Sequence, residues 1–291
     1  MDFMKIDENI AILKGFINIG LIWLGKELFL IDSGLEEEAK ELNGFLREKG
    51  LSPAVLINTH AHQDHCGANN YLQKHYNLDI FAAYKESLFI ENPLFEAYCF
   101  SSGASPLEEM KTLLPSRVTD FLLPGEKKEI KGGEFFFPSL VGHSIDQIGV
   151  GIGDILFCGD AFFSPYVLER YKLPFLVDLD RFLASLEYLK KSNYRVFIPA
   201  HGEATTDIET VVDLNIAKVK KIEEDILNLL VEEKSIEDLL EALFSYYEIK
   251  ISRPDQYFPL KTTVMAYLSS LSNRKSIRTG IKGNILSWRV N

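Results

Sequence analysis

One short stretch, THAHQDHCG at residues 59–67, constrains the fold more than any other feature of the chain. Three of the six histidines and an aspartate fall within six residues: His60, His62, Asp64 and His65. Residues i and i+2 of an extended segment point the same way, so His60 and His62 can converge on one metal ion. Asp64 and His65 follow where the chain is expected to turn into a helix, and they can face a second ion. The stretch therefore predicts ligands for two neighbouring metals.

The ligand types favour a catalytic metal site over a structural one. Structural zinc is usually closed by four side chains, mostly cysteines. Here the candidate ligands are His and Asp, and the three cysteines have no paired spacing. This mixture suits Zn, Fe or Mn with open coordination positions. We expect two divalent ions, with Zn as the first choice and Fe or Mn as alternatives.

Three more candidate ligands follow other predicted strands. His143 comes after FFFPSLVG, Asp160 closes DILFCGD, and His201 closes VFIPAHG. Any one of these histidines could be an ordinary core residue, but together they place five of the six at strand ends. Only His75, on the helix after the first cluster, is left without a role.

Hydrophobic patterning around these motifs predicts an α/β protein. Residues 9–32 read as a β-rich meander, and residues 34–50 carry apolar side chains at helical spacing. AVLINTH, residues 54–60, is a short apolar run typical of a strand buried on both faces. A second group of strands is expected before Asp160, and an amphipathic helix over residues 178–191.

The full set of candidate ligands resembles the motif set of the metallo-β-lactamase superfamily. The quoted matches are His60-Ala61-His62-Gln63-Asp64-His65, His143, Asp160 and His201, and FLIDSG is similar to the family's early strand ending in an aspartate, here Asp32. The resemblance covers about residues 5–205. It implies a four-layer αββα sandwich with the metals at one edge between two sheets.

The resemblance also implies which ligands bind which metal ion. His60, His62 and His143 would bind the first metal ion, Asp64, His65 and His201 the second, and Asp160 would bridge them. Two ions roughly 3.5–4 Å apart can hold and activate a water molecule, so Asp64 and Asp160 are expected to be catalytic as well. Asp32 is a candidate for orienting a ligand imidazole, with a helix cap as the alternative.

Metal-dependent hydrolysis of a small ester, thioester or lactone is the reaction that the resemblance predicts. Glyoxalase II-like thioesterases keep all seven ligands and add a helical C-terminal region. The redox diiron members carry an acid in place of His62, and acyl-homoserine lactonases carry Tyr in place of Phe163. True β-lactamases carry a leader that we do not find here. A mono-iron persulfide dioxygenase and a phosphodiesterase or ribonuclease remain alternatives.

The sequence becomes strongly helical in pattern near residue 205, where we place a boundary between domains 1–205 and 206–291. Helical runs are followed by a predicted hairpin around Lys282-Gly283, which together look like a winged helix with a core of Leu268, Leu271, Ile277, Ile285 and Trp288. The last 42 residues, 250–291, carry eight Lys or Arg and one Asp, whereas the whole chain has a net charge of −11. This basic tail could dock on the chain's own acidic body, bind an anionic ligand or nucleic acid, or serve a homodimer.

Other expectations concern the surroundings of the site. Residues 84–127 look like an insertion, which could be a lid or a packed decoration. Tyr166, Arg170 and Tyr171 are expected on a rim, with substrate contact or a plain surface role as alternatives. Three unpaired cysteines, no signal peptide and no run of ~20 apolar residues predict a soluble, cytoplasmic protein without a membrane partner.

Overall fold

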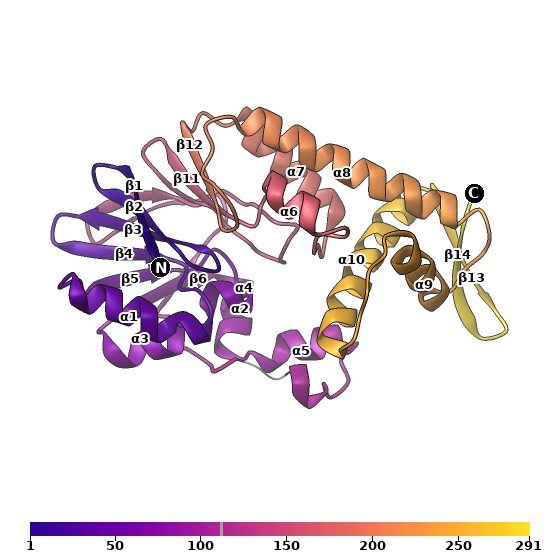
Figure 1. Cartoon of the computed structure of the whole chain (residues 1–291), viewed down its shortest axis with the longest axis horizontal. Helices are drawn as coiled ribbons and strands as arrows, with labels where there is room; N and C mark the ends of the chain where they lie inside the picture. Colours follow the sequence, from indigo (N-terminus) through magenta and orange to yellow (C-terminus); the bar gives the residue numbers. More distant parts are fainter. Residues whose placement is uncertain (111–112) are drawn as a thin grey trace.

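Two β-sheets stacked face to face, with helices on both outer faces, form the larger part of the molecule (Figure 1). The computed structural model describes residues 1–110 and 113–291. The first sheet contains β1 (Asp2–Asp7), β2 (Ile10–Lys14), β3 (Asn18–Leu24), β4 (Glu27–Ile31), β5 (Pro53–Ile57), β6 (Asp79–Ala83) and β7 (Asp120–Leu122), in that order. The second contains β12 (Val196–Pro199), β11 (Ile155–Gly159), β10 (Val150–Ile152), β9 (Gly133–Phe136) and β8 (Lys127–Ile130), in that spatial order.

The helices fall into two groups along the chain. Those up to residue 191 are α1 (Ala39–Glu48), α2 (Gln63–Cys66), α3 (Asn69–His75), α4 (Tyr84–Glu91), α5 (Leu94–Phe100), α6 (Pro165–Arg170) and α7 (Leu179–Lys191), with 3₁₀ turns η1 (Glu36–Glu38) and η2 (Glu108–Met110). The later ones are α8 (Ile208–Leu229), α9 (Ile236–Tyr246) and α10 (Pro254–Asn273), followed by the hairpin β13 (Ile277–Lys282) and β14 (Ile285–Val290).

Strand β4 shows how the sequence builds the layers. Leu28 and Leu30 pack on the side of α1 and α3, whereas Phe29 and Ile31 point into the space between the sheets. Successive side chains of a strand alternate between faces, so a strand that is apolar throughout must be covered on both. The expected αββα sandwich is therefore confirmed, including the strand predicted from AVLINTH.

The outer face of the second sheet is covered by α7 and α8. Leu156 of β11 belongs to the same apolar cluster as Phe182 and Leu186 of α7 and Val212 of α8. Helix α7 begins at Leu179, and the preceding N-cap residue Asp178 accepts a hydrogen bond from the Arg181 backbone N–H through its side chain. The predicted amphipathic helix over residues 178–191 is confirmed.

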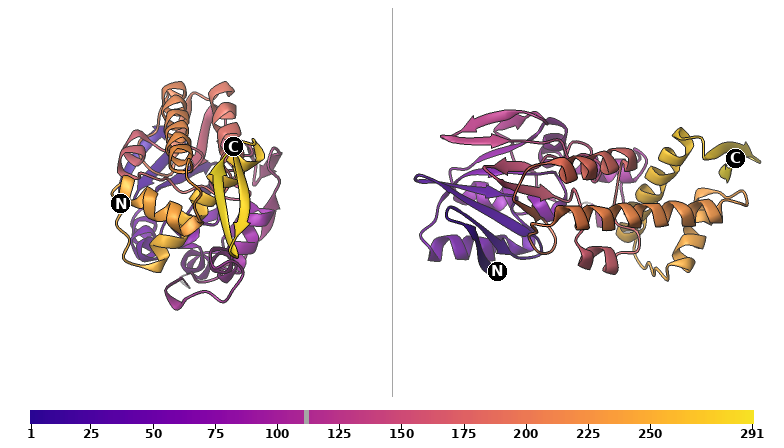
Figure 2. Two further views of the ribbon diagram at one scale, coloured as in Figure 1. Left: turned by 90° about the vertical axis from the view of Figure 1, so that its right-hand side faces the viewer. Right: turned by 90° about the horizontal axis from the view of Figure 1, so that it is seen from above.

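The last third of the chain forms three helices and a hairpin, the order of elements in a winged helix. Helix α8 runs from the sandwich to this region, whereas α10 begins near α5 and runs toward the hairpin (Figures 1 and 2). The backbone of Lys234 pairs with Trp288, which attaches the hairpin to the helices. Gly283 and Asn284 both have positive φ, as a two-residue type I′ turn requires.

Four of the five residues expected in the core of this region are buried: Leu268, Leu271, Ile277 and Trp288. The expectation for Ile285 was wrong, because its side chain is 58% exposed. It lies at the free tip of the hairpin, beyond the reach of the helices. The Ile285 backbone pairs with Lys282 across the turn.

Part of the segment 84–127 belongs to the two sheets, and the rest forms a helical insertion outside them. β7 pairs with β6 in the first sheet, and β8 begins at Lys127. Helix α5 and η2 instead lie near α10 in the described chain (Figure 1). Within the described residues, none of the helices has both the length and the hydropathy needed to span a membrane.

Candidate metal centre

All seven candidate ligands meet at one edge of the sandwich. His60 and His62 lie in the loop after β5, and Asp64 and His65 lie on the single turn of α2. Asp160 follows β11 directly, and His201 follows β12. The carboxyl ends of strands meet at the edge of an α/β sheet, which explains why distant motifs converge.

His143 reaches the same place from a different kind of segment. The sequence suggested that it follows its strand directly, but β9 ends at Phe136 and His143 lies in a turn. Gly142 makes that turn possible: its φ is 139°, and an added Cβ would lie 2.4 Å from the Phe182 backbone.

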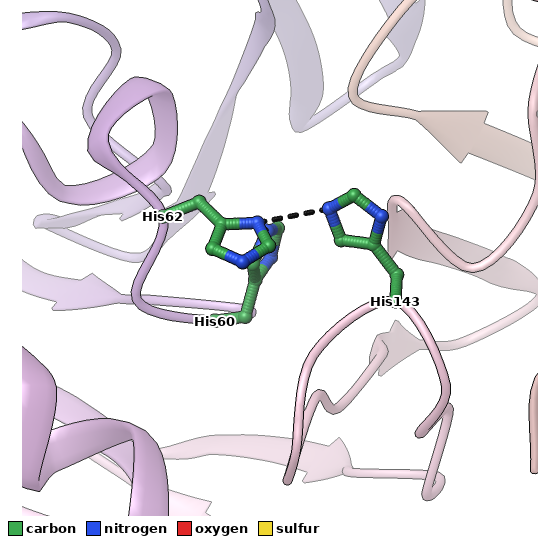
Figure 3. Close-up of side chains that lie close together, drawn as sticks. All are labelled: His60, His62 and His143. Atoms are coloured by element: carbon green, nitrogen blue, oxygen red, sulfur yellow. Dashed lines mark hydrogen bonds between the residues drawn. The ribbon is translucent and has the colours of Figure 1, made fainter. Parts of the chain in front are cut away.

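The first cluster consists of three histidines (Figure 3). Nδ1 of His62 lies 2.9 Å from Nε2 of His60 and 2.9 Å from Nε2 of His143. Three imidazole nitrogens facing one another without an intervening acceptor are an arrangement that a cation stabilises.

The second cluster consists of Asp64, His65, Asp160 and His201, whose ligand atoms all lie within 4.8 Å of one another. Nε2 of His201 lies 3.1 Å from Oδ2 of Asp64. Oδ2 of Asp160 lies 3.6 Å from Nε2 of His65 and 3.2 Å from Nε2 of His143. Asp160 therefore stands between the two clusters, where the resemblance places a bridging ligand.

Two of the candidate ligand histidines, His65 and His143, have a hydrogen-bond acceptor on the ring nitrogen that faces away from the clusters. Nδ1 of His65 lies 2.8 Å from Oδ2 of Asp32, and Nδ1 of His143 lies 2.9 Å from the carbonyl oxygen of Phe175. Each acceptor keeps the proton on Nδ1, so the Nε2 lone pair of each ring faces the clusters. Asp32 also accepts hydrogen bonds from the Thr59 backbone N–H and hydroxyl, both at 2.8 Å. Asp32 is a partner of a candidate ligand and does not cap a helix.

Burial and mutual charge shape the protonation states. Burial, followed by the neighbouring His143, lowers the pKa of His62 to about 3. Burial also lowers the pKa values of His60 and His143. Burial alone would raise the pKa of Asp64, but His65 and His201 lower it to about 2. At neutral pH the first cluster thus presents neutral imidazoles and the second an ionised carboxylate, the forms that bind metals.

A direct test of fit comes from unsatisfied polar atoms. Nε2 of His65 is buried and has no hydrogen-bond partner in the described structure. Such an orphan is costly in a folded protein unless a ligand occupies the position in front of it. The atom faces Asp64 and Asp160. The residues present therefore fit a divalent cation.

A cavity of about 560 Å³ opens over the two clusters. Phe100 from α5, Phe163 and Phe175 supply apolar walls, and Pro259 of α10 closes one side. The three rim residues Tyr166, Arg170 and Tyr171 also line this cavity.

Sequence reasoning missed two acids beside the first cluster. Glu86 on α4 is buried and accepts hydrogen bonds from the Ala61 backbone N–H, the Ser144 hydroxyl and the Asp146 backbone N–H, which ties the two histidine loops together. Oε1 of Glu96 on α5 lies 3.6 Å from Nε2 of His62. Burial, with repulsion from other acids, raises the pKa of Glu96 to about 8. Neither acid sits in a recognisable motif, so no signal in one sequence marks them.

Comparisons with known proteins agree with this architecture. The family model described as the metallo-beta-lactamase superfamily matches residues 13–201. Hydroxyacylglutathione hydrolase GloC of Haemophilus influenzae is 29% identical over 194 residues, which are 65% of this chain and 87% of that protein.

Two solved structures share the fold at low identity. A metallo-beta-lactamase family protein of Thermus thermophilus has a TM-score of 0.73, with 94% of each chain covered and 20% identity. A beta-lactamase domain protein of Burkholderia ambifaria has a TM-score of 0.79 and 16% identity, covering 100% of this chain and 94% of its own. The shared fold thus extends into the C-terminal helices. On the family match, the sandwich and the clustered histidines and aspartates, the chain belongs to the metallo-beta-lactamase superfamily and is a hydrolase of that superfamily.

Proposed function

We propose that this hydrolase uses two divalent metal ions to cleave small thioesters, with esters and lactones as chemically related substrates. Zn is the first choice for the metal, and Fe and Mn are the alternatives. The observation that carries the proposal is the pair of clusters joined by Asp160 in one cavity. In this assignment His60, His62 and His143 would hold one ion. Asp64, His65 and His201 would hold the other, and Asp160 would be a ligand to both.

The metals, when bound, would supply Lewis acidity and lower the pKa of water toward neutrality. Hydrolysis breaks the bond between the carbonyl carbon and sulfur. The oxygen of water joins the carbon and a proton passes to the sulfur, which gives a carboxylic acid and a thiol. The chain's own part is to hold the ligands: Asp32 and the Phe175 carbonyl orient two imidazoles. Phe163 and Phe175 exclude bulk water from one side of the centre.

Arg170 supports an anionic substrate. It is the one Lys or Arg among the described residues that line the cavity. Its guanidinium donates to the Tyr166 hydroxyl at 2.9 Å and lies over the rings of Tyr166 and Tyr171. Within the described chain no carboxylate lies at ion-pair distance from it, so its charge is available to a carboxylate on the leaving group. The Haemophilus relative is a hydroxyacylglutathione hydrolase by name, which agrees with a substrate that is an acyl derivative of a thiol.

The nucleic-acid alternative finds less support in the C-terminal region. In a helix-turn-helix arrangement the second helix enters the major groove, and here that helix is α10. Its one cation is Lys261, which pairs with Glu237 at 3.0 Å. Pro259 of α10 lines the metal-site cavity instead. A small-molecule substrate therefore agrees better with how α10 is used.

Elemental analysis followed by a substrate panel on the same sample tests the proposal. We expect two ions per chain and turnover of thioesters above phosphodiesters. H60A should lose metal and activity together. H75A is the matched control, because His75 is an exposed histidine on α3 that bonds only to the Tyr71 carbonyl in the described chain. Two ions retained in H60A would overturn the ligand assignment. A single iron with oxygen consumed alongside a persulfide would replace the hydrolase proposal with the dioxygenase.

A further inference from the structure

A second cavity, of about 120 Å³, lies beside the first cluster. Phe89 and Cys99 line it from α4 and α5, Ile145 from the loop after His143, and Val177 from the segment before α7. None of the motifs found in the sequence accounts for this space.

The second cavity adjoins the metal-site cavity. The two share His62, Glu96, Phe100 and Phe175 as lining residues. The space beside His62 is therefore the nearest apolar space for a group attached to a carbonyl carbon at the first cluster. Arg170 lines only the main cavity, so it faces a different part of the same substrate.

Two polar groups in the wall of the second cavity, Glu86 and Ser144, are already hydrogen-bonded, and Oε1 of Glu96 lies 3.6 Å from Nε2 of His62. The Glu86 carboxylate accepts three hydrogen bonds from Ala61, Ser144 and Asp146. The Ser144 hydroxyl is one of those donors, at 2.5 Å. With these groups satisfied, the remaining surface offers chiefly aromatic and aliphatic contacts, which favour an apolar occupant.

We propose that the second cavity is the subsite for the acyl group, and that the substrate carries an unbranched apolar acyl chain of about four to six carbons. The inference rests on the proposed thioester hydrolysis. The second cavity, at about 120 Å³, is slightly smaller than an apolar cavity of about 150 Å³ that takes up benzene. A short hydrocarbon chain therefore fits and a long one does not. The acyl chain lies on the side of the first cluster, and the anionic leaving group lies in the main cavity toward Arg170.

A chain-length series tests the subsite. The substrates are acetyl, butanoyl and hexanoyl thioesters of thioglycolate, with the released thiol measured on the metal-loaded enzyme. Hexanoyl has four more methylenes than acetyl, and each buried methylene is worth about fourfold in binding, so we expect hexanoyl to have a kcat/KM roughly 200-fold higher than acetyl. In V177F, which fills the cavity, we expect this ratio to fall below about threefold.

The matched control is V231F, because Val231 is 63% exposed just after the end of α8 and lines neither cavity. It should keep the wild-type ratio. C99F is a second filling variant on the exposed side of α5, and it should lower the ratio if V177F does not fold. Ligand-observed NMR with hexanamide and acetamide gives a readout that needs no turnover: hexanamide alone should bind, and V177F or C99F should abolish binding.

The outcomes separate the two proposals. Turnover of all three thioesters at equal kcat/KM, with no hexanamide binding, overturns the acyl subsite and leaves thioester hydrolysis standing. Turnover of none, with hexanamide bound in the wild type and not in V177F, overturns thioester hydrolysis while the apolar subsite holds. A ratio that persists in a folded V177F also rejects the subsite.

Discussion

Asp32 shows how much of the candidate centre depends on one side chain outside the ligand set. Its carboxylate takes two hydrogen bonds from Thr59 and one from His65, all in a buried position. Its backbone has a φ of 58°, a conformation that Asp and Asn tolerate better than most residues. The residue therefore fixes both the loop that carries His60 and the ring of His65.

Replacing Asp32 by Ala is expected to weaken metal binding at the second cluster by about 10- to 100-fold. The reason is that Nδ1 of His65 loses its acceptor, so neither its tautomer nor its ring orientation is held. Competition with a zinc chelator measures the affinity. D32N retains an acceptor oxygen and the same backbone preference, and should lose less. Equal affinities in wild type and D32A would contradict this role.

The histidines also predict how the stability of the metal-free protein depends on pH. Burial lowers the pKa values of His60, His62 and His143 below their ordinary 6.5, so the unfolded chain binds more protons than the folded one below pH 6.5. Stability therefore falls as pH decreases from 6.5, by up to about 1.4 kcal/mol per pH unit for each such histidine.

His65 and His201 lower the stability of the metal-free protein as pH rises above 6.5. Burial opposes their charge, but neighbouring aspartates raise both pKa values, so the stability they contribute is present below 6.5 and is lost as pH rises. Urea unfolding of chelator-treated protein should give a maximum near pH 6.5. A free energy of unfolding that stays flat from pH 5 to 8 would contradict these environments.

At the scale of elements, helix α8 reaches back to the loop that carries Asp160. Oδ1 of the buried Asn215 accepts a hydrogen bond from the Phe163 backbone N–H at 2.9 Å, and its Nδ2 donates to the Phe163 carbonyl at 2.8 Å. Phe163 lies in the loop after β11, outside any strand, and the Asn215 side chain bonds both its backbone N–H and its backbone carbonyl. This explains how a C-terminal helix supports a site built by the sandwich.

N215A is expected to lower the free energy of unfolding by about 2–4 kcal/mol, since it leaves a buried N–H and a buried carbonyl without partners. It should also weaken metal retention, because the Asp160 loop loses its anchor. N193A is the matched control: Asn193 is exposed and should change stability by less than about 0.5 kcal/mol. Denaturant unfolding and metal analysis measure the two effects. A stability equal to that of N193A would refute the anchoring role.

The elements show which parts of the fold a single sequence could predict. The apolar runs of β4 and β5 predicted strands, with β5 buried on both faces, and the periodicity of α7 predicted an amphipathic helix. The turn at His143 was not predicted, because it depends on contact between Gly142 and the Phe182 backbone, which is 40 residues away. The role of Glu86 was hidden for the same reason: its three donors come from loops that only the tertiary fold brings together.

At the scale of the whole molecule, the sandwich and the C-terminal region share one apolar core. A single buried cluster includes Phe197 of β12, Leu189 of α7, Ile222 of α8, Tyr267 of α10 and Trp288 of β14. The basic tail also pairs with acidic residues before it: Arg274 with Glu223 and Lys261 with Glu237. We infer that residues 206–291 act as a structural part of the enzyme, although their sequence texture marks them as a separate domain.

This shared core leads to a prediction about a fragment of residues 1–205. Removing α8 and α10 would expose the apolar face of α7, with Phe182, Leu186 and Leu189, and would remove the Pro259 wall of the cavity. Each large apolar side chain returned to water costs about 1.5–3 kcal/mol, and a handful of them matches the whole stability of a typical domain. The fragment should therefore aggregate or melt without a cooperative transition, whereas the full chain should unfold in one step by circular dichroism. A fragment that melts cooperatively at the temperature of the full chain and still binds two metal ions would show that residues 206–291 are a dispensable appendage.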